Sequence, residues 1–193
     1  MASMRRIVGA VAVLAALSAP ALGEARRASK GPYAEAGIGA TQFLGTGGEY
    51  SALGPSFAIR IGYDLFSFLS LGARIDTSMH EATVPPPPEG EYFQLYTGAA
   101  EARLGFNVWH LGVFADAGVG GSYMSTNILE KVDILEPGEK FTLMFSGGGG
   151  MEYQLQNRHY AFGLAGMWST YPSFGDGTPI SAITARAYLR YTY

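Results

Sequence analysis

Apolar side chains recur at every second position from Gly31 to the end of the chain, and turn-forming residues interrupt the pattern at intervals. A period of two is typical of β-strands with two different faces, and no stretch keeps helical spacing for long. Eight strands are predicted, at about residues 32–43, 56–65, 68–79, 91–106, 111–123, 141–153, 160–170 and 183–193. Lengths of about 10 to 14 residues are long for a soluble sheet but suit tilted strands that cross a membrane. Gln94 falls on the apolar face of its strand, which predicts a bulge or a wet strand end there.

The charged side chains of these strands lie on the faces opposite the apolar ones. Six acidic residues and five arginines share this placement: Glu35, Asp64, Asp76, Glu101, Asp116, Glu152, Arg60, Arg74, Arg103, Arg186 and Arg190. In an outer-membrane barrel the apolar face contacts lipid and the polar face lines the interior. Because an unpaired buried charge costs several kcal/mol, the near balance predicts a network of paired charges in the lumen. Side chains can just fill an eight-stranded barrel, which favours a plugged lumen over a conducting one.

The predicted connections alternate between short and long. Short turns are expected near residues 66–67, 107–110 and 154–159, and longer links at 44–55, 80–90, 124–140 and 171–180. This asymmetry is typical of short periplasmic turns and long external loops. Aromatic residues gather at the short-turn ends, as expected of a belt at a membrane interface. They are Tyr63, Phe66, Phe68, Phe106, Trp109, Tyr153, Tyr160, Tyr191 and Tyr193.

The N-terminus has the three parts of a secretory signal. Arg5 and Arg6 precede an uncharged run from residue 7 to 17, and small residues follow that permit cleavage after Ala21 or after Gly23. Pro20 and the shortness of the run disfavour a retained membrane anchor. We therefore predict a cleaved signal peptide at residues 1–23, a short periplasmic segment at 24–31 and the barrel at 32–193. The fold expected is all-β, an eight-stranded antiparallel up-and-down transmembrane barrel.

Composition excludes several other classes of protein. The chain has no cysteine, which rules out a disulfide framework and a thiolate metal site. Without Arg5 and Arg6 the 13 basic residues become 11, against 16 acidic ones. An acidic chain with no basic cluster argues against nucleic acid as a partner.

Candidate chemistry is sparse. His80 is expected in an external loop, and His110 and His159 in turns at the opposite end, so the three should not converge on a metal or catalytic site. Gly147 to Gly150 lacks the Lys and Ser or Thr of a phosphate loop and sits inside a predicted strand. These glycines are expected to let the wall curve or to make room for a large inward side chain. The sequence predicts no cofactor.

From Gly31 to Tyr193 the pattern resembles that of the OmpA/OmpX-type small outer-membrane barrels, and also that of small barrels from gliding bacteria. The most specific part of the resemblance is the last strand, where Leu189, Tyr191 and Tyr193 share one face. That face resembles the terminal signal read by the barrel-assembly machinery. The resemblance implies an outer-membrane location, with outer-membrane lipid and lipopolysaccharide as surroundings.

Four functions are open on this evidence. The first is a structural or interaction protein that docks envelope partners through loops 80–90 and 124–140, the latter mixing Glu130 and Asp133 with apolar residues. The second is a narrow pore or a transporter of small or hydrophobic molecules. A soluble lipocalin-like barrel is disfavoured because it would bury the apolar faces. Some small barrels are lipid-modifying enzymes built around His and Ser, but no predicted strand holds a His with a Ser two residues away, so the chain is not expected to be an enzyme.

Overall fold

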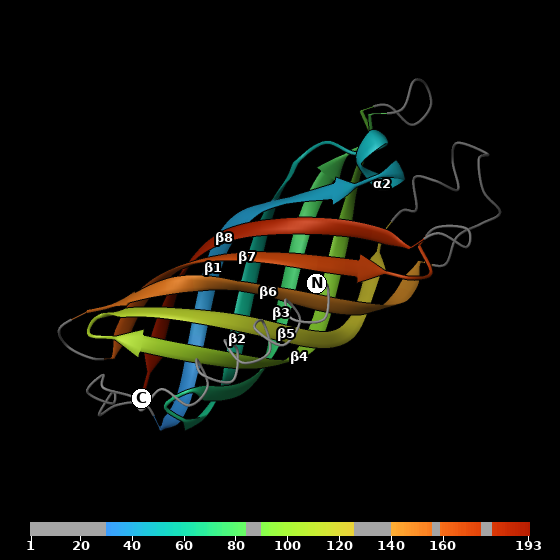
Figure 1. Ribbon diagram of the computed structural model, residues 1–193. Coiled ribbons are helices and arrows are strands. Elements are labelled where there is room, and N and C mark those ends of the chain that lie inside the picture. Colours follow the sequence, from blue (N-terminus) through green and yellow to red (C-terminus); the bar gives the residue numbers. More distant parts are fainter. Residues whose placement is uncertain (1–29, 84–89, 126–139, 156–158, 175–178) are drawn as a thin grey trace, which may run out of the picture.

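A computed structural model describes residues 30–83, 90–125, 140–155, 159–174 and 179–193. The predicted signal peptide, most of the segment at 24–31, parts of three long loops and residues 156–158 of a short turn lie outside these residues. Eight antiparallel strands form a closed barrel in chain order, with the last strand paired to the first (Figure 1). The strands are β1 (Gly31–Leu44), β2 (Gly54–Phe66), β3 (Leu69–Glu81), β4 (Tyr92–Val108), β5 (Leu111–Met124), β6 (Phe141–Gln154), β7 (Tyr160–Tyr171) and β8 (Ile180–Thr192).

The observed strands confirm the eight predicted ones to within three residues at each end. A short helix, α2 (Thr46–Glu49), follows β1. No helix in the described ranges is long and apolar enough to cross a membrane. Of the two alternatives predicted at Gln94, the bulge is wrong, because Gln94 pairs with Met79 in regular register, and Gln94 lies exposed close to the start of β4. A register shift lies instead between Asp64 and Phe66, beside the tight turn from β2 to β3.

The faces of the strands are arranged as in a membrane barrel. Large apolar side chains point outward, such as Ile38 at 69% and Ile75 at 72% exposed. Charged side chains point inward, where Arg60 is 2% and Glu35 is 4% exposed. An apolar outer wall is stable in lipid and not in water, so this inversion indicates a transmembrane strand set.

The two ends of the barrel differ. The short-turn end holds the start of β1, the end of β8 and the tight turns after β2 and β4, while α2 lies at the opposite, long-loop end (Figure 1). At the tip of the β4–β5 turn, Trp109 is 88% exposed and has a φ of 58°.

Two inward glycines confirm that missing side chains make room for large ones. A Cβ on Gly150 would lie 2.7 Å from the ring of Phe114, and a Cβ on Gly163 would overlap the ring of Tyr188. These two rings pack edge to face inside the barrel, with centroids 6.2 Å apart. The glycines therefore allow two bulky aromatics to occupy a narrow lumen.

Candidate functional site

Arg103 on β4 is the centre of the charged part of the lumen. Its guanidinium lies 2.7 Å from Glu35, 2.8 Å from Asp116 and 3.7 Å from Glu152, which come from three other strands. The same group lies over the ring of Phe114, 3.9 Å from the centroid. A planar guanidinium with five N–H donors can serve several carboxylates at once, which explains why arginine occupies this place.

A second centre lies nearer the short-turn end. Arg190 on β8 binds both carboxylate oxygens of Asp64, at 2.5 and 2.6 Å, and also contacts Glu35 at 3.3 Å. Ser70 donates a hydrogen bond to Asp64, and Arg190 lies over the ring of Tyr33 at 3.9 Å. The two-point contact with Asp64 is the strongest ion-pair geometry available to arginine.

Arg60 and Arg74 extend the network toward the middle of the barrel. Arg60 contacts Asp116 at 3.3 Å and Glu101 at 3.2 Å. Arg74 contacts the same Glu101 at 2.7 Å and Asp76 at 3.1 Å. Since Glu101 joins these two arginines and Asp116 joins Arg60 to Arg103, ten of the eleven predicted charges form one connected set.

Arg186 is the exception. Its side chain points inward and is 7% exposed, but within the described ranges it has no carboxylate within ion-pair distance. Its Nη2 is buried without a hydrogen-bond partner in that part of the chain. The structure therefore brings together all the predicted lumen charges but one.

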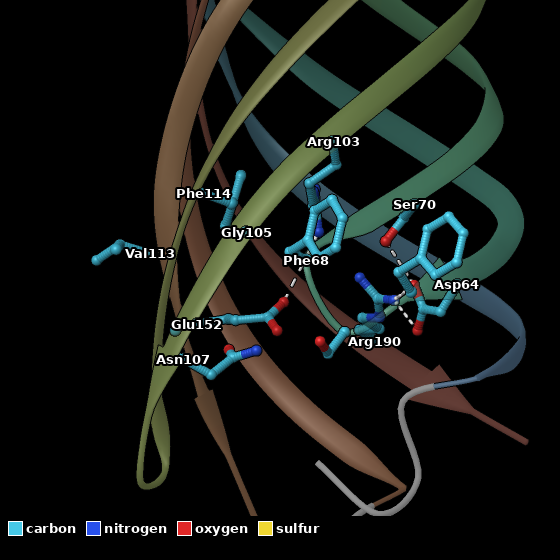
Figure 2. A pocket seen from close by; sticks show the side chains of 13 residues that line it. Asp64, Phe68, Ser70, Arg103, Gly105, Asn107, Val113, Phe114, Glu152 and Arg190 are labelled. Atoms are coloured by element: carbon cyan, nitrogen blue, oxygen red, sulfur yellow. Dashed lines mark hydrogen bonds and ion pairs between the residues drawn. The ribbon is translucent and has the colours of Figure 1, made fainter. Parts of the chain in front are cut away.

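A cavity of about 30 Å³ lies at the short-turn end of the network (Figure 2). Its polar lining includes Asp64, Ser70, Glu152 and Arg190, and these side chains converge from different strands in Figure 2. A space of this size holds about one or two water molecules. Its lining residues include none of the apolar cluster described below.

An apolar cluster occupies the long-loop half of the lumen beside buried polar side chains such as Ser78, Thr97 and Thr142, which corrects the expectation of a polar interior throughout. The cluster consists of these buried side chains: Phe43, Ala82, Phe93, Leu95, Ala99, Met124, Met144, Tyr171, Phe174, Ile180 and Ala182. The alternation of side chains along β4 already places part of this cluster in the lumen. Phe93 and Leu95 have the same parity along β4 as Arg103, and side chains of one parity share one face of a strand.

Residues 45–53, which we call the lid segment, cover this apolar cluster. Gly47 in α2 is buried, Tyr50 packs against the cluster, and Ser51 forms a β-bridge with Ala82. Ser51 is 2% exposed, and its hydroxyl donates a 2.7 Å hydrogen bond to the carbonyl of Gly47. The lid segment therefore covers part of the apolar cluster at the long-loop end.

The prediction that His80 lies in an external loop is wrong. His80 is on β3, faces the lumen and is 1% exposed. Its Nε2 lies 2.9 Å from the hydroxyl of Ser78, so a strand does hold a His with a Ser two residues away. Both side chains are buried inside the barrel and not on its lipid-facing wall.

The other candidate residues lie apart from the lumen. His159 binds the carbonyl of Thr192 through Nδ1 at 2.8 Å, and His110 packs against the ring of Tyr153. On the outer face of β8, Tyr191 and Tyr193 form an edge-to-face pair 4.7 Å apart. No cluster of metal-ligating side chains occurs in the part of the chain that the structure describes.

Comparison with known proteins agrees with this architecture. No curated protein matches the chain significantly. Neisserial surface protein A superposes with a TM-score of 0.61 at 17% identity, over 84% of this chain and 97% of that chain. OprG from Pseudomonas aeruginosa gives 0.57 at 11% identity, over 88% and 99% of the two chains. The N-terminal barrel domain of OprF from the same organism gives 0.50 at 13% identity, over 84% and 99%. At these identities the likeness shows a shared fold.

The family model for the outer membrane protein beta-barrel domain matches residues 9–191, nearly the whole chain. Because outer-membrane barrels have short periplasmic turns and longer external loops, we expect the short-turn end to face the periplasm and the long-loop end to face the outside. The chain belongs to the outer membrane protein beta-barrel domain family, and it is a small barrel of the OmpA/OmpX type in the outer membrane of a Gram-negative cell.

Proposed function

We propose that the protein is a closed barrel with a structural or docking role that it performs through its external loops. The observation that carries this proposal is that the lumen is filled in both halves. Ion pairs occupy the periplasmic half, and an apolar cluster under the lid segment occupies the external half. Conduction needs a continuous path of water, and a packed, mainly apolar section opposes such a path.

The arrangement of the charges supports a plug over an ion path. An ion path requires charges that can exchange their partners with the passing ion. Here each carboxylate within the network is held by at least one arginine, and Glu35 is shared between Arg103 and Arg190. Breaking such a buried pair leaves an uncompensated charge, so the network resists opening.

We propose outer-membrane lipid and lipopolysaccharide as the surroundings of the outer wall. We further propose envelope proteins as partners of loops 80–90 and 124–140, most of which lie outside the described residues. We also propose that the barrel-assembly machinery reads Leu189, Tyr191 and Tyr193, whose aromatic members are on the outer face of β8.

We propose no catalytic role for Ser78 and His80. A lipid-modifying enzyme must present its nucleophile to a lipid, and Ser78 is 4% exposed inside the lumen. With an enzyme set aside, a narrow pore or transporter is the alternative function, and the next experiment tests it.

Conductance in planar lipid bilayers separates a plug from a pore. The wild-type barrel should give no steady conductance, whereas a variant with both Phe93→Ser and Leu95→Ser should admit water into the apolar half and conduct. Phe57→Ser, on the lipid-facing wall where Phe57 is 45% exposed, serves as the matched control and should stay closed. Steady, ion-selective conductance of the wild-type barrel would overturn the closed-lumen proposal.

The docking role is tested in cells that lack the native gene. A variant without residues 126–139 should reach the outer membrane as a folded barrel but fail to restore envelope integrity, measured as exclusion of an apolar dye. If the shortened barrel restores dye exclusion as fully as the wild-type protein, residues 126–139 are not required for envelope integrity.

A further inference from the structure

Backbone hydrogen bonds hold the lid segment against the end of β3. The N–H of Ala52 donates to the carbonyl of Glu81 at 2.9 Å, and the N–H of Thr83 donates to the carbonyl of Tyr50 at 3.0 Å. The hydroxyl of Thr83 donates to the carbonyl of Glu49 at 3.0 Å. Single hydrogen bonds of this kind contribute only about 1 kcal/mol each. A free-energy change of a few kcal/mol at one contact can therefore release the lid segment.

His80 links this lid segment to the inside of the barrel. Its Nδ1 lies 3.0 Å from the carbonyl oxygen of Ala52, which can only accept, so Nδ1 carries the hydrogen. Its Nε2 lies 2.9 Å from the hydroxyl of Ser78 and accepts from it when the ring is neutral. Both nitrogens of the neutral imidazole are therefore satisfied, and one of them holds the lid segment.

The imidazole also packs against two aromatic rings. Its ring stacks on Phe93 with centroids 5.3 Å apart and packs against Phe43 at 4.8 Å. The titratable and charged side chains on the neighbouring elements are Glu49 and Tyr50 on the lid segment, Arg74, Asp76 and Glu81 on β3, and Glu91 and Tyr92 next to Phe93. Within the described residues, the hydrogen bonds of the imidazole are made with Ala52 and Ser78. The charged residues of β1 and β2 (Glu35, Arg60 and Asp64) belong to the network in the periplasmic half.

A second proton on His80 would put a positive charge into this apolar site. No carboxylate of the described residues forms an ion pair with His80, and burial of an unpaired charge costs several kcal/mol. The hydroxyl of Ser78 would also have to turn from donor to acceptor. Movement of the lid segment away from the lumen would let water solvate the imidazolium, which removes most of that cost.

We propose that His80 is an acid-sensitive latch whose protonation releases the lid segment from the external end of the lumen. Histidine is the side chain whose charge changes nearest to neutral pH, so mild acid outside the cell is the signal. The release depends only on the contacts of His80, and it would occur whether or not the external loops dock a partner.

The absence of cysteine allows a clean test by thiol labelling of the folded barrel in lipid vesicles. Ala82→Cys places a thiol at a position that is 1% exposed under the lid segment, and Glu81→Cys places a reference thiol at the neighbouring exposed position. The ratio of the two labelling rates cancels the intrinsic effect of pH on thiol reactivity. We expect this ratio to rise at least about tenfold from about pH 7.5 to about pH 5.

His80→Asn is the deciding variant, because its amide can still donate to Ala52 but does not titrate. Its labelling ratio should stay low and flat across the same pH range. A flat ratio in the wild-type background overturns the latch, and an equal rise in His80→Asn assigns the release to another group.

A second measurement needs no substitution. Amide exchange of Ala52 in the wild-type barrel, corrected for the intrinsic pH dependence of exchange, should show a larger opening equilibrium in acid. Opening that is independent of pH would overturn the proposal even if His80→Asn did not fold.

Discussion

Arg103 shows how much one side chain organises in this lumen. It contacts carboxylates from β1, β5 and β6 and stacks on a ring from β5. Arg186 is also a buried arginine that faces the interior. It has no ion pair within the described ranges. The two arginines form a natural comparison, because only one of them neutralises carboxylates at short range.

Arg103→Met keeps the length of the apolar stem and removes the charge. The free energy of unfolding should fall by about 3 to 5 kcal/mol, because Glu35 and Asp116 lose their nearest cation. Arg186→Met should leave it unchanged or raise it, since the substitution removes a buried charge that has no ion pair within the described ranges. Urea unfolding of the barrel in lipid vesicles, followed by tryptophan fluorescence, measures both. Equal losses for the two variants would show that Arg103 stabilises the barrel by something other than ion pairing.

At the scale of one strand, the glycines of β6 play different structural roles on its inward and outward faces. Gly150 points inward, where a Cβ would overlap the carbonyl oxygen of Leu164 and approach the ring of Phe114. Gly147 points outward, and a Cβ there would meet no atom within 4 Å. The interior requires glycine at the first position, and the outer wall does not require it at the second.

Gly150→Ala should therefore lower the free energy of unfolding by about 1 to 3 kcal/mol through overpacking. Gly147→Ala should leave it unchanged or raise it by up to about 1 kcal/mol, because alanine restricts the unfolded chain more than glycine does. The same urea titration compares the two variants. A larger loss for Gly147→Ala would contradict the assignment of faces in β6.

At the scale of the whole molecule, the barrel joins two kinds of interior inside one apolar wall. The periplasmic half resembles a salt-bridged core, and the external half resembles the hydrophobic core of a soluble protein. In the closed-barrel proposal, ion pairs block a continuous water path in one half and apolar packing opposes it in the other. The lid segment adds closure at the end where the chain is exposed to the outside.

Assembly of the whole barrel in cells should depend on its C-terminal strand. Tyr193 is 68% exposed and packs only against Tyr191 among the described aromatic rings, so Tyr193→Ala should cost little stability. We expect the variant to refold in detergent like the wild-type protein but to reach the outer membrane in several-fold lower amounts. Gel mobility before and after boiling reports the folded fraction in both cases. Trp109→Ala, an exposed aromatic at the same end, is the control, and an equal loss for it would argue against a terminal assembly signal.

The sequence by itself determined the number of strands, their approximate bounds and which face of each strand contacts lipid. These properties are local, because alternation along each strand encodes its two faces and turn residues mark its ends. The correct placement of Arg60, Glu101 and Asp116 on the inward face follows from the same rule. His80 was misplaced by one residue at a strand end, where such predictions are weakest.

Only the tertiary structure decided which inward residues meet. Arg190 contacts Glu35 across a separation of 155 residues, and Arg103 contacts it across 68. These pairings, the isolation of Arg186 and the contact of His80 with Ala52 depend on the stagger with which the sheet closes on itself. That stagger is a property of all eight strand pairings together, so no single stretch of sequence contains it.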